Sequence, residues 1–138
     1  MVVDTCVVIS LLVPDLHTAA AERAVKKAAK LSLSAFVALE LFDVLGRRVR
    51  DKTIPGDRAR MLRELFASSI AEGYWRVVEV TQSHVVTASG WLADASLGFR
   101  AGDALHASLA HALKEPLLTS DHDLAASAKR AGVKVRRL

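Results

Sequence analysis

The chain has 138 residues, of which 51% are hydrophobic and one is a cysteine, and it carries a formal net charge of +4 at pH 7. These values predict one domain with a substantial core, and they exclude an internal disulfide and a zinc site made of several cysteines. No apolar run approaches the roughly 20 residues of a membrane span, and no basic segment precedes the opening run, which Asp4 interrupts. We therefore expect a cytoplasmic protein without a membrane anchor or signal peptide.

The opening stretch, residues 1–9 (MVVDTCVVI), is an apolar run with one carboxylate inside it. Its β-branched residues, followed by helical patterning, predict the central strand of a parallel sheet. A buried carboxylate costs several kcal/mol unless it is paired, hydrogen-bonded or bound to a metal. Asp4 is therefore expected either to cap the turn after the strand or to bind a cation.

The rest of the chain alternates helices and strands. Helices are expected at residues 15–30, 34–50, 57–69, 81–98, 102–113 and 124–130, and strands at residues 31–33, 77–80, 117–119 and 133–135. This alternation predicts right-handed crossovers and an α/β fold, a three-layer α/β/α sandwich around a central parallel sheet, in a single domain over residues 1–138.

Three aspartates are expected at the carboxyl edge of this sheet, where parallel sheets collect their ligands. Asp4 and Asp121 follow strands, and Asp103 begins the helix before the fourth strand. An aspartate at such a junction is usually a cap or part of an Asx-turn, so each one alone also has a local explanation.

Glu40 is unusual because it lies on the apolar stripe of its expected helix, within about 40° of Phe36 and Val44. A charged side chain on that face needs a partner. The choice is between an ion pair with Arg47, two turns further on, and a place beside the three aspartates.

Four carboxylates brought together would repel one another unless they were protonated or bound a cation. Ligands that are all oxygen atoms suit a hard ion such as Mg²⁺ or Mn²⁺. An acidic metal site in a basic protein suits a phosphodiester substrate, because basic side chains hold the polyanion while the metal activates water.

The motifs Asp4-Thr5, Glu40, RAGDALHA at residues 100–107 and LTSDHD at residues 118–123 together resemble those of a PIN domain. The length and order of the elements resemble most the VapC toxins of toxin–antitoxin pairs. The resemblance covers nearly the whole chain. Two departures are Cys6, in place of the frequent Asn or Ser, which predicts a weakened or missing hydrogen bond, and Leu124, in place of a frequent aromatic residue.

The resemblance implies a metal-dependent RNA endonuclease. It implies that one or two Mg²⁺ or Mn²⁺ ions are bound by four catalytic acids, which are Asp4, Glu40, Asp103 and Asp121. Asp123 is a possible fifth acid, and the supporting hydroxyls are those of Thr5, Thr119 and Ser120. The resemblance also implies an RNA substrate, a homodimer, and a cognate antitoxin that wraps a groove between helices and reaches the active site.

Other residues carry weaker predictions. His106, three residues after Asp103, is expected to pack or hydrogen-bond rather than bind metal, and Cys6 is expected to be a small core residue because no base accompanies it. The best RNA-contact candidate is a basic cluster, here defined as Arg47, Arg48, Arg50 and Lys52, although a solvated helix end explains it equally well.

Three alternatives stay open beside the toxin. One is a PIN nuclease in RNA processing, and another is a catalytically silent domain that binds RNA or a protein partner. The third is a receiver-like signalling module, which would need an aspartate after the third strand and a lysine after the fifth. It is disfavoured because the third strand ends in Glu79-Val80-Thr81 and Lys134 lies inside the fifth.

Overall fold

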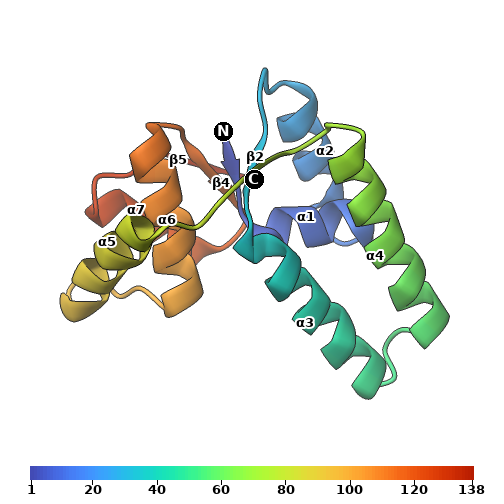
Figure 1. Cartoon of the computed structure of the whole chain (residues 1–138). Helices are drawn as coiled ribbons and strands as arrows, with labels where there is room; N and C mark the ends of the chain where they lie inside the picture. Colours follow the sequence, from blue (N-terminus) through green and yellow to red (C-terminus); the bar gives the residue numbers. More distant parts are fainter.

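The computed structural model describes all 138 residues and shows a five-stranded, entirely parallel sheet with seven helices. The strand order is β3-β2-β1-β4-β5, so the first strand is central, as predicted (Figure 1). The strands are β1 (Val2–Val3), β2 (Ser32–Ser34), β3 (Arg76–Val78), β4 (Leu117–Thr119) and β5 (Val135–Arg137).

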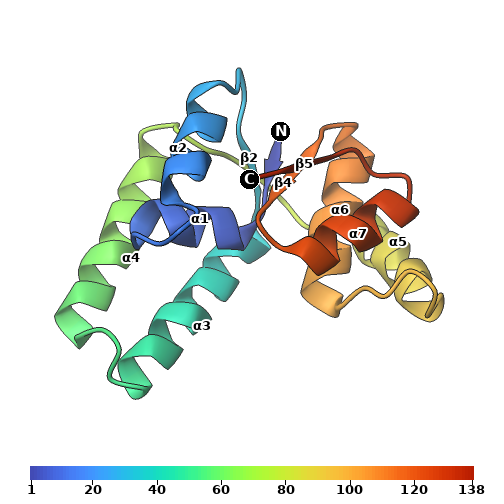
Figure 2. The same ribbon diagram turned by 180° about the vertical axis from the view of Figure 1, so that it is seen from behind.

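The helices cover both faces of the sheet and confirm the predicted α/β/α sandwich. They are α1 (Thr5–Leu12), α2 (Thr18–Lys26), α3 (Phe36–Arg50), α4 (Gly56–Ala71), α5 (Gln82–Ala93), α6 (Ala101–Leu113) and α7 (His122–Arg130). Helices α1 to α4 lie on one side and α5 to α7 on the other, which is clearest when the two opposite views are compared (Figures 1 and 2). None of these helices has the length and apolar content needed to cross a bilayer.

Each layer of helices has its own core, because successive residues of a strand point to opposite faces. Val3 and Leu118 pack into the core beneath α1 to α4. Val2 and Leu117, their neighbours on the same two strands, pack into the core beneath α6 and α7. The two central strands are therefore buried on both faces.

The strand predicted in the opening run ends before Asp4, as expected, but the helix that follows directly from Thr5 was not predicted. The chain turns at Asp4, whose extended backbone stands at the N-cap position, and continues as α1 from Thr5. Val7 and Val8 are fully buried in that helix. Because burial against the sheet outweighs the weak helix propensity of β-branched residues, the short apolar run folds as a helix.

Smaller differences concern element ends. Ser34, the first residue of the predicted helix 34–50, instead ends β2, and its Oγ accepts a hydrogen bond from the Phe36 N–H at 3.1 Å. The third strand begins one residue earlier than predicted and ends at Val78. The last strand lies two residues later, because Gly132 takes a left-handed turn with φ of 77° before Val135 pairs with Leu117.

Candidate active site

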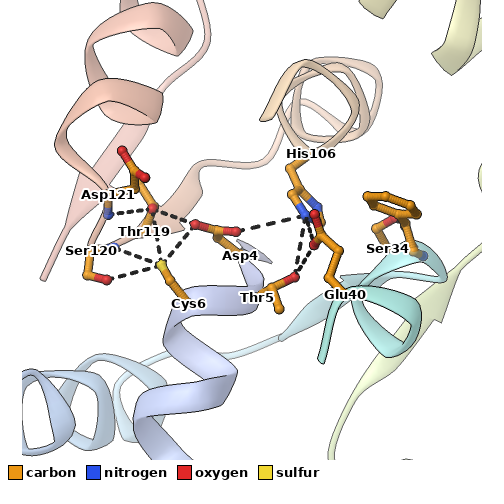
Figure 3. A network of polar contacts seen from close by, with 10 residues as sticks. Asp4, Thr5, Cys6, Ser34, Glu40, His106, Thr119, Ser120 and Asp121 are labelled. Atoms are coloured by element: carbon orange, nitrogen blue, oxygen red, sulfur yellow. Dashed lines mark hydrogen bonds and ion pairs between the residues drawn. The ribbon is translucent and has the colours of Figure 1, made fainter. Parts of the chain in front are cut away.

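Asp4 lies where β1 ends, and the main chain around it joins two strands to a helix. Its N–H donates to the Leu118 carbonyl at 3.0 Å, while its own carbonyl accepts the first hydrogen bonds of α1. Its side chain makes no capping hydrogen bond. Instead, Oδ2 accepts from Thr119 Oγ1 at 2.7 Å and from Cys6 Sγ at 2.9 Å (Figure 3). The capping explanation is therefore wrong for Asp4.

Glu40, in the second turn of α3, points toward Thr5 and His106 rather than along its own helix (Figure 3). Its Oε2 accepts hydrogen bonds from Thr5 Oγ1 and from His106 Nε2, the latter at 2.7 Å. Arg47, the alternative partner, pairs with Asp43 at 3.2 Å instead. Burial raises the pKa of Glu40, but its hydrogen bonds and the nearby histidine outweigh this effect and hold the pKa below its usual value.

Gly102 lets the start of α6 approach Glu40 closely. A Cβ atom at this position would lie 2.7 Å from Glu40 Oε1 and 3.4 Å from Phe36 Cε1. Because Glu40 is already tied at Oε2, it has little freedom to move away. The missing side chain of Gly102 is therefore part of the geometry of the site, and the sequence analysis did not identify it.

Asp103 occupies the first turn of α6 and accepts no hydrogen bond from the chain. Burial, together with the negative charges of Asp4 and Asp121, raises its pKa to about 6. The nearby His106 and Arg100 oppose this shift only in part. The raised pKa indicates that three of the predicted acids share one region of negative potential.

Asp121 follows β4 and does cap a helix. Its Oδ1 accepts from the backbone N–H groups of Asp123 and Leu124, at 2.7 and 2.9 Å, which begins α7. Its own N–H donates to Thr119 Oγ1 at 2.9 Å. The side chain of Asp123 is 81% exposed, and it lines an open pocket together with Asp103.

The predicted supporting hydroxyls reach the acids by two routes. Thr5 and Thr119 donate directly to Glu40 and Asp4. Ser120 acts through Cys6, because both its N–H and its Oγ lie within 3.3 Å of the sulfur. The hydrogen bond from position 6, predicted to be weakened or missing, is present, because the Cys6 thiol donates to Asp4. Burial raises the pKa of the Cys6 thiol to about 12, which agrees with its predicted lack of nucleophilic character.

His106 is 1% exposed and contacts the acids from the inner face of α6. Its hydrogen bond to Glu40 agrees with the prediction of a packing or hydrogen-bonding residue. The spacing from Asp103 placed it near the site, but no sequence signal identified Glu40 as its partner, because that contact joins two helices far apart in the chain.

The basic cluster (Arg47, Arg48, Arg50 and Lys52) lies at the end of α3 and in the turn before α4. This end is remote from Glu40, about 15 Å along the helix axis for Arg50 at 1.5 Å per residue (Figure 1). The basic cluster therefore lies well away from the acids.

A hard divalent cation suits the donor set, because the acids offer only oxygen atoms. Mutual repulsion also raises the pKa of Asp103, and a cation would relieve it. However, no three acidic, histidine or cysteine side chains stand in a geometry that could hold a metal ion. Glu40 is tied to His106 and Thr5 through Oε2, and Asp121 is tied to the start of α7 through Oδ1, so each offers only its other carboxylate oxygen to an ion.

Solved structures share this fold at low sequence identity. FitAcB from Neisseria gonorrhoeae is similar at a TM-score of 0.77 and 19% identity, over 97% of this chain and 94% of that one. VapC20 from Mycobacterium tuberculosis, a sarcin-ricin loop cleaving toxin, is similar at a TM-score of 0.72 and 21% identity, over 96% of this chain and 95% of that one. DNA-bound VapBC from Salmonella typhimurium is similar at a TM-score of 0.69 and 16% identity, over 99% of this chain and 96% of that one.

No curated protein sequence matches the chain. The model of the PIN domain family, in contrast, matches residues 1–130, which include every acid described above. The parallel sheet with helices on both faces agrees with that match. The chain belongs to the PIN domain family.

Proposed function

We propose that this protein is a metal-dependent RNA endonuclease and the toxin of a toxin–antitoxin pair, which hydrolyses phosphodiester bonds with metal-activated water. The observation that carries the proposal is the convergence of the acids. Asp4 and Asp121 raise the pKa of Asp103, and Asp4 and Glu40 flank the same nitrogen of His106, at 3.8 and 2.7 Å. Such a concentration of negative charge favours a bound cation.

In this proposal Asp4, Glu40, Asp103 and Asp121 hold one or two Mg²⁺ or Mn²⁺ ions, and Asp123 is an additional ligand. A bound ion would provide a nucleophile at neutral pH by lowering the pKa of water, and it would stabilise negative charge on the phosphate. The four acids come from separate parts of the fold, the end of β1, α3, α6 and the turn after β4, and Asp123 comes from α7. Their relative positions therefore depend on the sheet and not on one mobile loop.

The Thr119 hydroxyl and the Cys6 thiol orient the carboxylate of Asp4. Thr119 and Cys6 both donate to Oδ2 of Asp4, which leaves Oδ1 without a hydrogen-bond donor. Thr119 in turn accepts the N–H of Asp121, so the two aspartates are coupled through one hydroxyl group. These contacts favour binding of an ion by Asp4 through Oδ1.

An RNA substrate and a protein partner complete the proposal. The positive net charge and the basic cluster favour a polyanion, whose backbone would extend from the acids along α3. VapBC and FitAcB complexes among the structural neighbours support a cognate antitoxin as partner. We further propose a homodimer in the cytoplasm, with residues 1–138 forming one nuclease domain.

The test is cleavage of a panel of structured RNAs by purified protein, with Mg²⁺, Mn²⁺ or EDTA. Wild type is compared with Asp4→Asn and with Glu22→Gln, which changes an exposed acid on α2 and serves as the control. We expect cuts by wild type and Glu22→Gln in the presence of metal, and none with EDTA or with Asp4→Asn. Equal cutting by Asp4→Asn, or in EDTA, would refute the acid site.

The genetic context separates a toxin from an RNA-processing nuclease. A short reading frame directly upstream, encoding a protein with a DNA-binding N-terminus, is expected for a toxin. Co-expression with that protein should relieve growth arrest caused by this chain, and Asp4→Asn should not arrest growth at all. Unimpaired growth on expression of active wild type would favour the processing role.

A further inference from the structure

His106 occupies a position that links the acids through a single atom. Its Nε2 lies 2.7 Å from Glu40 Oε2, 3.5 Å from Thr5 Oγ1 and 3.8 Å from Asp4 Oδ1 (Figure 3). The three partners come from α3, from the first residue of α1 and from the end of β1. One side chain of α6 therefore connects three other parts of the fold at the carboxyl edge of the sheet.

The other ring nitrogen has no partner. Nδ1 is buried, and it is the one buried side-chain nitrogen or oxygen of the chain without a hydrogen bond. Buried polar atoms in proteins are nearly always hydrogen-bonded, because an unpaired one loses its hydration without compensation. A residue that served only to fill the core would be better replaced here by an apolar one. The presence of a histidine at this buried position is thus explained by the hydrogen bond of Nε2 to Glu40.

The contacts of His106 divide the oxygen atoms of the two acids into two kinds. Oε2 of Glu40 is occupied by His106 and Thr5, as Oδ2 of Asp4 is occupied by Thr119 and Cys6. Oε1 of Glu40 and Oδ1 of Asp4 accept no hydrogen bond from the chain. Each acid therefore keeps one oxygen atom for another ligand.

We propose that His106 is a positioning residue, which holds Glu40 by a hydrogen bond from Nε2–H and thereby fixes the free oxygens of Glu40 and Asp4 for a divalent cation. The proposal rests on the proposed function, because it assumes that these acids bind a metal. Phe36 supports the orientation of the imidazole, since its ring lies against it with a centroid distance of 6.0 Å. Loss of a residue that orients a metal ligand typically lowers metal affinity by about 10- to 100-fold.

The test compares two amides of different reach. In His106→Gln the amide N–H can be placed near the position of Nε2, whereas in His106→Asn it ends about one bond length short of Glu40. His106→Met fills the same space without a donor. His111→Gln is the control, because His111 is exposed on the same helix and packs on Trp91, outside the network. Circular dichroism and a thermal melt establish which variants are folded.

Binding of Mn²⁺ to the metal-free proteins is measured by calorimetry, without RNA. We expect a loss of about 10-fold or more in affinity for His106→Asn and His106→Met, a loss of less than about 3-fold for His106→Gln, and none for His111→Gln. Either of the Asn and Met variants is sufficient if the other does not fold. Rescue by Gln alone distinguishes positioning from general packing, because Met fills the core as well as Gln does.

The outcomes separate this proposal from the proposed function. If wild type binds Mn²⁺ and every folded His106 variant binds it equally tightly, the positioning role is refuted while the metal site stands. If the Gln variant loses as much affinity as the Met variant, the hydrogen bond is not the cause and the proposal also fails. If wild type itself binds no Mn²⁺ and cuts no RNA, the proposed function fails first.

Discussion

Replacing Asp103 by Asn should stabilise the metal-free protein, which is an unusual expectation for a change in an active site. The carboxylate of Asp103 accepts no hydrogen bond from the chain, so the amide removes charge without removing a contact. Burial and the charges of Asp4 and Asp121 raise its pKa from 3.8 to about 6. The ionised side chain is therefore a source of instability in the folded protein.

The pH dependence follows from the direction of this shift. The folded protein binds the proton on Asp103 more tightly than the unfolded chain does, so stability falls as the pH rises from 3.8 to about 6 and stays low above that. A shift of this size corresponds to about 3 kcal/mol at most, at about 1.36 kcal/mol per pKa unit. Because the side chain is only half-buried and is screened by solvent and salt, we expect about 1–2 kcal/mol.

Urea unfolding in EDTA at pH 8 measures the effect, with Asp123→Asn as the control because its side chain is 81% exposed. Asp103→Asn should raise the free energy of unfolding by about 1–2 kcal/mol, and the gain should shrink as the pH is lowered toward 4. Asp123→Asn should change it by less than about 0.5 kcal/mol. An Asp103→Asn variant that is no more stable than wild type at pH 8 would contradict the argument that the acids repel one another.

Two further predictions concern the surroundings of the acids, and a third concerns the basic cluster. Gly102→Ala should displace Glu40 and lower Mn²⁺ affinity about 10-fold or more. Gly90→Ala is the control, because a Cβ atom at this position in α5 would meet no atom within 4 Å. It should leave metal binding unchanged and raise the free energy of unfolding in urea by about 0.5–1 kcal/mol. The Cys6 thiol, with its pKa of about 12, should resist iodoacetamide at pH 8 in the folded protein and react in urea, and rapid labelling of the folded form detected by mass spectrometry would contradict its burial. Changing the arginines of the basic cluster to Gln should reduce both the RNA affinity and the salt dependence of RNA binding. Filter binding at several salt concentrations measures both. An unchanged dependence of RNA affinity on salt would show that the basic cluster is only a solvated helix end.

The prediction of the acids rested on two kinds of signal. Asp4 and Asp121 could be placed because they follow strands of a parallel sheet, whose carboxyl ends share one edge. Glu40 could be placed because it is charged on an apolar helix stripe, and such a residue must find a partner in the interior. Both signals depend on local periodicity, which the sequence carries directly.

The contacts that bind the site together could not be predicted in the same way. Local rules gave capping as an explanation for each aspartate, and this holds for Asp121 but not for Asp4, whose side chain turns to β4. Nothing in the sequence indicates that His106 meets Glu40, because the pairing requires α3 and α6, which lie on opposite sides of the sheet, to meet at its carboxyl edge. The closeness of Gly102 to Glu40 has the same origin.

The first helix shows the limit of propensity. Residues 5–9 have the composition of a strand, yet they form the start of α1, with Val7 and Val8 fully buried. A short apolar run does not distinguish a buried strand from a buried helix, since both are apolar on every side. The turn at Asp4 decides the matter, and it is also what places that carboxylate at the edge of the sheet.

Binding of Mn²⁺ to the metal-free protein tests the central claim most directly, because it requires no knowledge of the RNA target. The loss of the free Mn²⁺ signal in electron paramagnetic resonance gives both affinity and stoichiometry for wild type, Asp4→Asn and Asp103→Asn. The account predicts that wild type binds one or two ions and that each variant binds at least about 10-fold more weakly. Wild type that binds no Mn²⁺, or variants that bind it as tightly as wild type, would contradict the assignment of these acids to a metal site.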